Sequence, residues 1–215
     1  TTPEELGSTV KLWLKADAIV GLNHGDPVGT WENQVSNAHA SEATNKPTYQ
    51  TNGLNGLPIV RFDGVNDKLA TSAPVQTATS AYTIMVVAKF ANSTDTANQA
   101  IVYNGSSASN DGYGIMRGVS STNLGAFHAP NWAPDSASTA DWEIITIYRT
   151  GGTVYMRRNG VLVSLSGATA APSTPTTATY IGSYSSRGGF APGGIAEGIL
   201  CHAPPSDAPL TTTEL

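Results

Sequence analysis

The stretch DWEIITIYRTGGTVYMRRNGVLVSLSG, residues 141–167, contains three short runs of β-type residues separated by two turns that contain glycine. Asn159 and Gly160 stand between two of these runs, and both residue types tolerate the positive φ that a two-residue hairpin turn requires. Gly151 and Gly152 form the same kind of turn one run earlier. The stretch therefore predicts a three-stranded antiparallel meander, and its apolar residues require a second layer to cover the sheet.

Strand-like runs continue on both sides of this meander. The run YTIMVVAKF, residues 82–90, is apolar at almost every position, which predicts a central strand covered on both faces. Further runs lie at residues 10–14, 58–62, 99–103, 113–117, 124–127, 179–182 and 195–202. Because such runs recur roughly every 8 to 15 residues without a helical period between them, they predict an all-β fold, a sandwich or jelly roll of two antiparallel sheets.

The composition is typical of one turn-rich domain. The 215 residues include 22 glycines and 13 prolines, while 40% of the chain is hydrophobic and 13% is charged. We therefore expect a single domain over residues 1–215. The net charge is −5 and no basic cluster exceeds Arg157-Arg158, which argues against a nucleic-acid partner. No apolar run approaches the roughly 20 residues of a membrane helix, so we expect no membrane insertion.

Five segments together carry a resemblance to a known family: VKLWLKAD (10–17), GLNHGDPVGTWEN (21–33), NGLPIVRFDGVNDKL (55–69), DWEIITIYRTGGTVYMRRNGVLV (141–163) and GGIAEGILCHAPPSD (193–207). They resemble the laminin G-like (LamG) modules of the concanavalin A-like lectin/glucanase jelly-roll superfamily, in particular the bacterial and phage branch. The resemblance implies a two-sheet antiparallel β-sandwich of the concanavalin A-like jelly-roll type. It implies no single function, because the superfamily contains lectins, carbohydrate-binding modules, glycosidases, polysaccharide lyases and structural modules.

Carboxylates that could form a catalytic pair are sparse in the sequence. Glycoside hydrolysis needs two carboxyl groups about 5 to 10 Å apart. Asp141 and Glu143 share one face of an expected strand, whereas Glu197 is isolated. The Gln-x-His motif of the superfamily's lyases is absent, and the four histidines are scattered. We therefore predict no catalytic residue and a protein that is not an enzyme, with a glycosidase or polysaccharide lyase as an alternative.

Two segments carry the aromatic and planar polar side chains that sugar binding requires. NDGYGIMR, residues 110–117, places alternate side chains on one face of a strand, and FHAPNW, residues 127–132, adds a loop. The predicted ligand-binding residues, including one from the loop at 184–190, are Tyr113, Arg117, His128, Asn131, Trp132 and Arg187. The alternative interpretation makes Tyr113 a core residue and Trp132 a plug at one end of the sandwich. We expect the other three tryptophans, Trp13, Trp31 and Trp142, to be core residues.

Calcium is the cofactor that the sequence suggests. Asp63, Asn66 and Asp67 supply three oxygen ligands in one tight turn, whereas Ca²⁺ takes six to eight. The same turn forms without a metal ion, because Asp caps its own turn and the following glycine accepts a positive φ. Cys201 is the single cysteine, which excludes an internal disulfide and a cysteine-based metal cluster.

These observations predict a surface recognition module that binds a glycan or a cell-surface polysaccharide, as a lectin-like or adhesive protein. The alternative is a phage or virion structural protein, a tail or capsid-surface component, in which the fold mediates self-association or particle assembly. We expect an extracellular or virion-surface location. The chain begins at Thr1 without a signal-peptide pattern, so we expect a processed or excised form.

Overall fold

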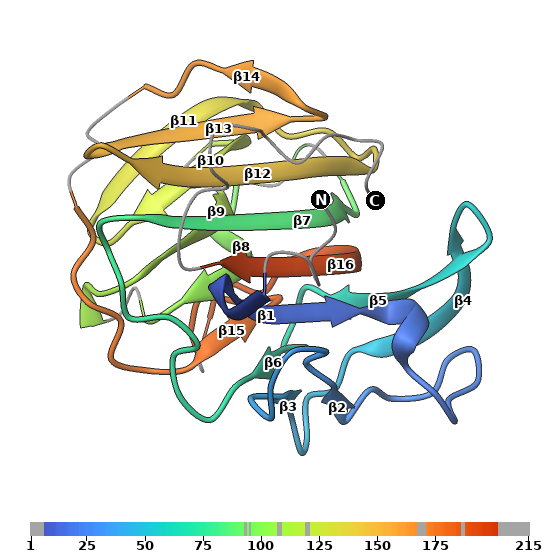
Figure 1. Cartoon of the computed structure of the whole chain (residues 1–215). Helices are drawn as coiled ribbons and strands as arrows, with labels where there is room; N and C mark the ends of the chain where they lie inside the picture. The colour runs from blue at the N-terminus through green and yellow to red at the C-terminus, as the bar shows by residue number, and fades with distance from the viewer. Residues whose placement is uncertain are drawn as a thin grey trace.

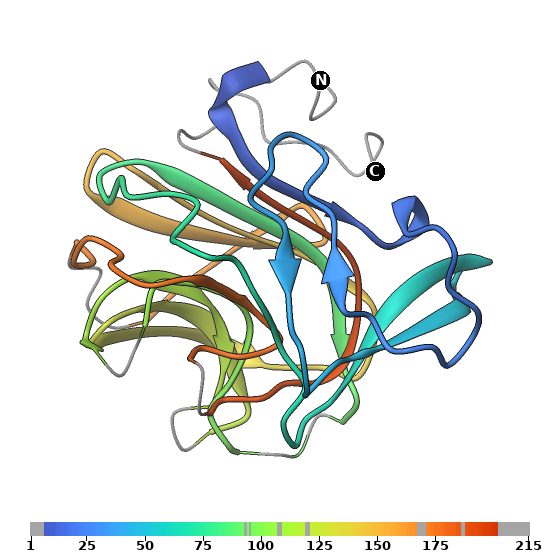
Figure 2. The ribbon, with the colours of Figure 1, turned by 90° about the horizontal axis from the view of Figure 1, so that it is seen from below.

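The computed structural model describes residues 7–92, 94, 96–106, 109–118, 121–166, 171–185 and 188–201. In this part of the chain, two antiparallel sheets pack face to face, which confirms the predicted all-β sandwich (Figures 1 and 2). Two single-turn 3-10 helices, η1 (Gly7–Thr9) and η2 (Ala16–Ala18), flank the first strand. No helix among the described residues is long and apolar enough to cross a lipid bilayer.

The first sheet, sheet A, has the strand order β14-β13-β12-β7-β16-β5-β4, and β1 pairs with β16 beside this path. Its strands are β1 (Val10–Lys15), β4 (Thr48–Leu54), β5 (Leu57–Asp63), β7 (Tyr82–Phe90), β12 (Glu143–Thr150), β13 (Thr153–Arg158), β14 (Val161–Val163) and β16 (Pro192–Cys201). The predicted meander is confirmed as β12-β13-β14. The apolar run 82–90 is confirmed as central, because β7 lies between β12 and β16.

The second sheet, sheet B, has the order β11-β10-β9-β8-β15-β6-β3-β2. Its strands are β2 (Thr30–Trp31), β3 (Ala40–Ser41), β6 (Leu69–Ala70), β8 (Gln99–Asn104), β9 (Tyr113–Arg117), β10 (Asn123–His128), β11 (Asn131–Ala137) and β15 (Thr179–Ile181). Strands β2, β3, β4, β6 and β11 were not expected from the sequence. β2, β3 and β6 have two residues each, too few for a sequence pattern. β4 and β11 are edge strands with polar residues, and β11 contains Pro134, which an edge strand tolerates.

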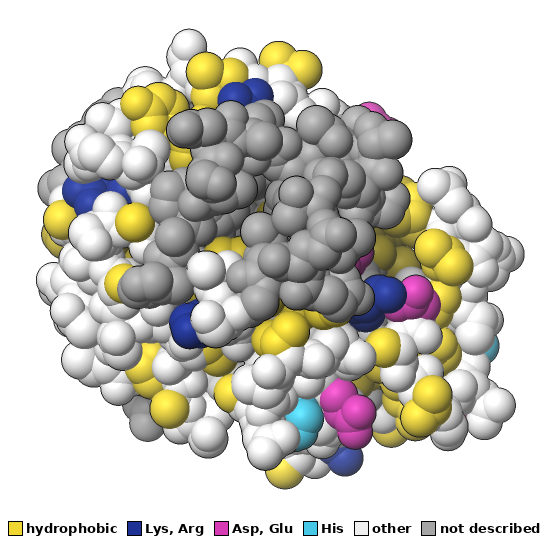
Figure 3. Space-filling view, in the orientation of Figure 1, with side chains coloured by type: hydrophobic (Ala, Val, Ile, Leu, Met, Phe, Trp, Pro, Cys, Tyr) yellow, Lys and Arg dark blue, Asp and Glu magenta, His cyan; other side chains and the backbone are white. Residues whose placement is uncertain are grey.

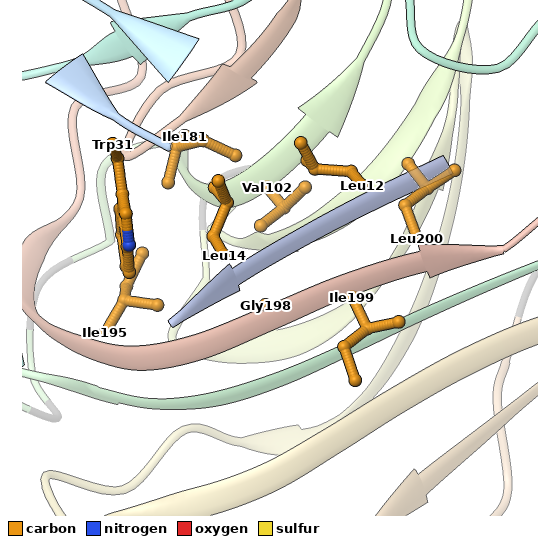
Figure 4. Close-up of a pocket in the computed structure, with 9 residues that line it drawn as sticks. All are labelled: Leu12, Leu14, Trp31, Val102, Ile181, Ile195, Gly198, Ile199 and Leu200. Atoms are coloured by element: carbon orange, nitrogen blue, oxygen red, sulfur yellow. The ribbon is translucent and has the colours of Figure 1, made fainter. Parts of the chain in front are cut away.

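The main hydrophobic core fills the space between the two sheets. Trp31 is fully buried there and donates its indole N–H to the carbonyl oxygen of Lys15 over 2.9 Å. Figure 4 shows side chains from both sheets in this interior, where Leu200 of β16 faces Leu12 while its neighbour Ile199 points to the opposite side of the strand. The alternation buries apolar groups on both faces of β16, as expected for a strand in the middle of a sheet.

Strand β16 changes its partner on one side half-way along its length. Its first half pairs with β5, up to Ile195 opposite Val60, and its second half pairs with β1, from Glu197 opposite Lys15. The register toward β7 shifts between Ile195 and Glu197, so Ala196 is the extra residue of a β-bulge. The edge of β16 that faces away from β7 is therefore paired with β5 before the bulge and with β1 after it, so sheet A branches at this point.

The β4–β5 hairpin projects from the body of the molecule beside this division (Figures 1 and 2). Its turn is formed by Asn55 and Gly56, whose φ values of 49° and 84° suit a tight hairpin of the primed type. The pairing of β4 with β5 is irregular between Gln50 and Leu54. A Cβ at Gly53 would lie 2.4 Å from Cγ1 of Ile59, so only glycine fits at this bend.

Candidate functional site

A groove of about 360 Å³ opens on the outer face of sheet A where β16 changes its partner. The projecting β4–β5 hairpin forms one wall, and residues at the start of β12 together with the β13–β14 turn form the other. The lining residues are Lys15, Asp17, Leu54, Asn55, Leu57, Pro58, Val87, Trp142, Glu143, Ile144, Asn159, Ala196 and Glu197. Its volume lies within the range of about 300 to 1,000 Å³ that is typical of small-ligand sites.

The bulge at Ala196 determines which side chains of β16 reach the groove. Without the extra residue, strict alternation from Glu197 would place Ile195 on the outer face, whereas Ile195 belongs to the core between the sheets. With it, Ala196 and Glu197 both line the groove. The bulge therefore keeps an apolar side chain inside and brings a carboxylate to the floor of the groove.

Strand β1 holds the Glu197 carboxylate in place. Trp13 donates its indole N–H to Oε1 of Glu197 over 2.5 Å, and Lys15 lies directly opposite Glu197 in the strand pairing. The Lys15 ammonium lies 3.6 Å from Oδ2 of Asp17 and 5.4 Å from the centre of the Trp13 ring. In Figure 3 a basic and an acidic side chain lie side by side over the end of β1 and η2, facing hydrophobic side chains of the β4–β5 hairpin.

Trp142 supplies an aromatic surface at the opposite wall. Its ring is half-buried and packs over Gly194, where an added Cβ would lie 2.9 Å from Cη2 of Trp142. The ammonium of Lys89 lies 5.5 Å from the ring centre. Exposed Asn159 completes this wall, and its Oδ1 accepts the backbone N–H of Ile144 over 2.9 Å. The groove thus combines an indole ring with carboxamides and carboxylates, which are the groups that bind sugar rings and hydroxyls.

Glu143, a member of the carboxylate pair considered in the sequence, is bound to Arg158. Its Oε1 and Oε2 accept hydrogen bonds from Nη2 and Nε of Arg158 over 2.6 and 2.8 Å, and Thr139 donates to Oε1 over 2.5 Å. Asp141 is exposed and precedes β12. The two residues therefore do not share one face of a strand as the sequence predicted.

Three of the predicted ligand-binding residues lie in the interior. Tyr113 is fully buried and stacks on Tyr82 with ring centres 3.8 Å apart, and its hydroxyl donates to the carbonyl oxygen of Ala78 over 3.1 Å. Arg117 is also fully buried, with its guanidinium 4.1 Å from the centre of the Phe90 ring. His128 is 2% exposed and hydrogen-bonds the Tyr82 hydroxyl through Nε2. Side chains buried in this way cannot contact a ligand at the surface.

Of the remaining predicted residues, Asn131 lies opposite His128 in the pairing of β10 with β11, whereas Trp132 lies on the other face of sheet B. Asn131 and Trp132 are half-buried at the start of edge strand β11, and Trp132 packs against Phe127 on the outer face of sheet B with ring centres 6.3 Å apart. Arg187 lies outside the described residues. A binding role of Asn131 and Trp132 stays a prediction, on the sheet opposite the groove.

The Asp63 turn has the self-capped form that the sequence offered as the alternative to calcium. Oδ1 of Asp63 accepts the backbone N–H groups of Val65, Asn66 and Asp67, and Oδ2 of Asp67 accepts the N–H of Asp63 over 2.9 Å. These bonds occupy one oxygen of each carboxylate. Within the described ranges no group of three or more His, Cys, Asp or Glu side chains is arranged to hold a metal ion. Calcium binding here stays a prediction.

The sequence did not predict the groove residues as a site. Trp142 was expected in the core but lines the groove. Trp31 and Trp13 are confirmed as core residues: Trp31 lies between the sheets, and Trp13, which is 7% exposed, belongs to a smaller buried cluster on the outer face of sheet A. The pattern GGIAEGILC carries one signal for the site: a glutamate within an otherwise apolar strand must find a polar environment or a partner.

No family model and no curated protein matches the chain, whereas many solved structures share its fold. Trypanosoma rangeli sialidase in complex with sialic acid is 12% identical with a TM-score of 0.64, over 93% of this chain and 31% of that one. Domain 4 of AbnA, a GH43 extracellular arabinanase from Geobacillus stearothermophilus in complex with arabinotriose, is 13% identical with a TM-score of 0.60. That match covers 91% of this chain and 93% of the domain.

The binding domain of Paraclostridial Mosquitocidal Protein 1 is a third similar structure, 11% identical with a TM-score of 0.62 over 92% of this chain and 50% of that one. At these identities the likenesses show the β-sandwich fold alone, and the laminin G-like family with its bacterial and phage branch stays a prediction. The chain spans about a third of the length of the sialidases that it matches.

The prediction that the protein is not an enzyme is contradicted by this comparison. Several structures that share the fold over more than nine-tenths of the chain are sialidases, so the sandwich occurs within enzymes. The match covers 31% of the sialidase chain at 12% identity, so it concerns the fold that these enzymes contain and assigns no catalytic residue to this chain.

Proposed function

We propose that the chain is a carbohydrate-binding domain of a protein that acts on or recognises glycans, and that the groove on sheet A binds a short segment of the sugar chain. The observation that carries this proposal is the groove itself, which places the half-buried Trp142 ring, the Asn55 and Asn159 side chains and the Glu197 carboxylate around one hollow. The indole packs against the C–H face of a sugar ring, while the amides and carboxylate bind its hydroxyls.

The solved structures support the same class of ligand. One of them is a domain of an arabinanase in complex with arabinotriose, and it matches this chain over nearly the whole length of both. Others belong to sialidases, and one is the binding domain of a mosquitocidal protein. Because the sialidase structure contains sialic acid and the arabinanase domain contains arabinotriose, a glycan is the ligand class that we test.

Two tryptophan variants separate the groove from the site predicted by sequence. Trp142 lines the groove on sheet A, and Trp132 is half-buried on the outer face of sheet B, so each is the matched control of the other. Binding is measured by a glycan array with neutral and acidic oligosaccharides, followed by calorimetric titration of the strongest hits. We expect Trp142→Ala to weaken binding by about tenfold or more, since one lost aromatic contact costs on the order of 1 kcal/mol or more, and Trp132→Ala to leave it unchanged.

If Trp132→Ala weakened binding and Trp142→Ala did not, the binding site would lie on sheet B, and the assignment of the groove as the site would be wrong. Absence of binding to every oligosaccharide by the parent protein would overturn the proposed function. Circular dichroism and a thermal melt of each variant establish that the sandwich is intact, so that a loss of binding reports the loss of a contact.

A further inference from the structure

Apolar side chains line both walls of the groove and the strands between them. We infer that the groove selects sugars that carry a methyl group, as a 6-deoxyhexose or on an acetyl substituent, over sugars with a hydroxyl-bearing group in the same place. This inference rests on the proposed function and adds the chemical class of the ligand. The apolar residues are Leu54, Leu57 and Pro58 on the hairpin wall, Trp142 and Ile144 on the opposite wall, and Val87 and Ala196 between them.

Leu57 is the most exposed apolar residue of the hairpin wall. Its side chain is 55% exposed, whereas Leu54 and Pro58 are half-buried. Leu54 lies directly opposite Leu57 in the pairing of β4 with β5, and both residues line the groove, so their side chains form one apolar surface. Hydrophobic side chains of this hairpin are visible beside the groove in Figure 3. A ligand can therefore cover apolar surface here that water covers in the free protein.

The two walls offer a sugar different contacts. A ring that packs on Trp142 turns its C–H face toward the indole, so groups at the rim of the ring approach the hairpin wall. A hydroxyl group pressed against leucine and proline side chains loses hydrogen bonds to water, and these side chains replace none of them. A methyl group in the same position buries additional apolar surface instead. The hairpin wall therefore favours a methyl group.

The remaining hydroxyl groups of such a sugar still find polar partners in the groove. Asn55 is exposed at the tip of the hairpin, and Asn159 is exposed on the opposite wall. Their carboxamides can donate and accept hydrogen bonds, as sugar hydroxyls require. The groove thus suits a ligand that combines an apolar substituent with hydroxyl groups, which describes a methyl-bearing sugar better than a hydrocarbon.

The test uses two pairs of sugars, one for each source of the methyl group. L-fucose and L-galactose differ at C6, where fucose carries a methyl group and galactose a hydroxymethyl group. Chitotriose and cellotriose differ at C2, where chitotriose carries acetamido groups and cellotriose hydroxyl groups. Calorimetric titration of the parent protein measures all four affinities. In at least one pair we expect the methyl-bearing member to bind about fourfold or more tightly than its partner, the fold-change that one buried group of this size gives.

A variant of Leu57 locates the selection at the hairpin wall. Leu57→Asn replaces the apolar side chain by a polar one of similar size, so we expect the ratio of affinities within the pair to fall to about one. Leu162→Asn is the matched control, because Leu162 is 52% exposed on β14 and is not part of the groove lining. Both side chains are more than half exposed, so neither change removes a core contact, and thermal melts check that each variant is folded. A general weakening of the fold would lower both affinities and leave their ratio unchanged.

The outcomes separate this inference from the proposed function. Equal affinities in both pairs, or tighter binding of the hydroxyl-bearing members, would overturn the inference and leave the proposed function standing. A ratio unchanged by Leu57→Asn, or abolished equally by Leu162→Asn, would also overturn it. If none of the four sugars binds while the glycan array gives other ligands, the groove does not select for a methyl group. If the array gives no ligand either, the proposed function fails and the inference fails with it.

Discussion

Trp13 donates its indole N–H to Oε1 of Glu197 over 2.5 Å, although the two residues are 184 positions apart in the sequence. The bond crosses from β1 to β16 on the outer face of sheet A, at the point where the bulge at Ala196 turns Glu197 toward the groove. It helps to fix the orientation of the carboxylate at the floor of the groove. The groove therefore depends on a contact between the two ends of the described chain.

We expect Trp13→Phe to weaken glycan binding several-fold and to lower the free energy of unfolding by about 1 kcal/mol, the net contribution of one hydrogen bond. The phenyl ring keeps most of the packing, so the change removes mainly the N–H donor. Calorimetric titration and urea unfolding measure the two effects. In a double-mutant cycle with Glu197→Ala, which removes the acceptor, additive losses of affinity would contradict a role of the pair as a unit.

Gly194 permits Trp142 to lie against sheet A. An added Cβ would lie 2.9 Å from Cη2 of Trp142 and 2.8 Å from Cδ1 of Ile59, so the side chains must shift. We expect Gly194→Ala to reduce stability by about 1 to 3 kcal/mol, as overpacking does, and to weaken glycan binding. Gly198→Ala is the matched control on the same strand, since a Cβ there meets its nearest atom at 3.8 Å. Equal effects of the two changes would rule out the close approach to Trp142 as the cause.

Arg158 joins β13 to the start of β12 and to the edge of sheet B. Its guanidinium pairs with Glu143 at 2.6 Å and with Asp135 at 3.2 Å, and the side chains of all three are about nine-tenths buried. Arg158→Ala leaves the Glu143 carboxylate without its partner, and we expect a loss of about 3 kcal/mol in urea unfolding. Arg157→Ala, which removes one exposed hydrogen bond to Gly160, should cost less than about 1 kcal/mol. If Arg158→Ala lowered the free energy of unfolding no more than Arg157→Ala does, the ion pair would contribute little to stability.

The Asp63 turn predicts a dependence of stability on pH. Burial raises the pKa of Asp67, the N–H of Asp63 lowers it, and the nearby Asp63 carboxylate raises it, with a result of about 6 against an ordinary value of 3.8. The folded chain thus binds this proton more tightly than the unfolded chain does. The contribution of Asp67 is therefore most favourable below about pH 4 and is lost as the pH rises to about 6.

At pH 7.5 we expect Asp67→Asn to increase the free energy of unfolding by on the order of 1 kcal/mol and so to raise the melting temperature. At pH 4 we expect the melting temperature to change little. The carboxamide oxygen still accepts the Asp63 N–H, so the turn is preserved. Thermal melts across this range measure the difference, and a constant offset at every pH would refute the assignment to Asp67. The same melts with added Ca²⁺ test the calcium prediction, because an ion bound to this turn would stabilise the parent protein more than the variant.

The sequence predicted the strands that carry the core better than the strands at the edges. The apolar run of β7 and the glycine turns of the meander are local signals, and both appear in the structure at the predicted residues. Strand β4 is polar, and β11 contains Pro134. Edge strands need neither an apolar pattern nor a full set of N–H donors, so their sequences resemble those of loops.

The candidate site could not be predicted from local sequence patterns, and the reason is different from that for the edge strands. Glu197 seemed isolated because its neighbours Trp13 and Lys15 come from the other end of the chain, and only the pairing of β1 with β16 brings them together. Conversely, the alternation that placed Tyr113 and Arg117 on one face of β9 was correct, but that face points into the core. Periodicity identifies a shared face, whereas the packing of the sheets decides whether the face meets solvent or the interior.

The β4–β5 hairpin has a consequence for how such a domain diversifies. One wall of the groove belongs to a ribbon whose tip, from Leu54 to Leu57, projects from the sandwich, while the floor belongs to strands that the core holds in place. Lengthening or replacing that tip would resize the hollow without disturbing the packed interior. The fold thus separates the residues that can vary with the ligand from those that must stay constant for the chain to fold.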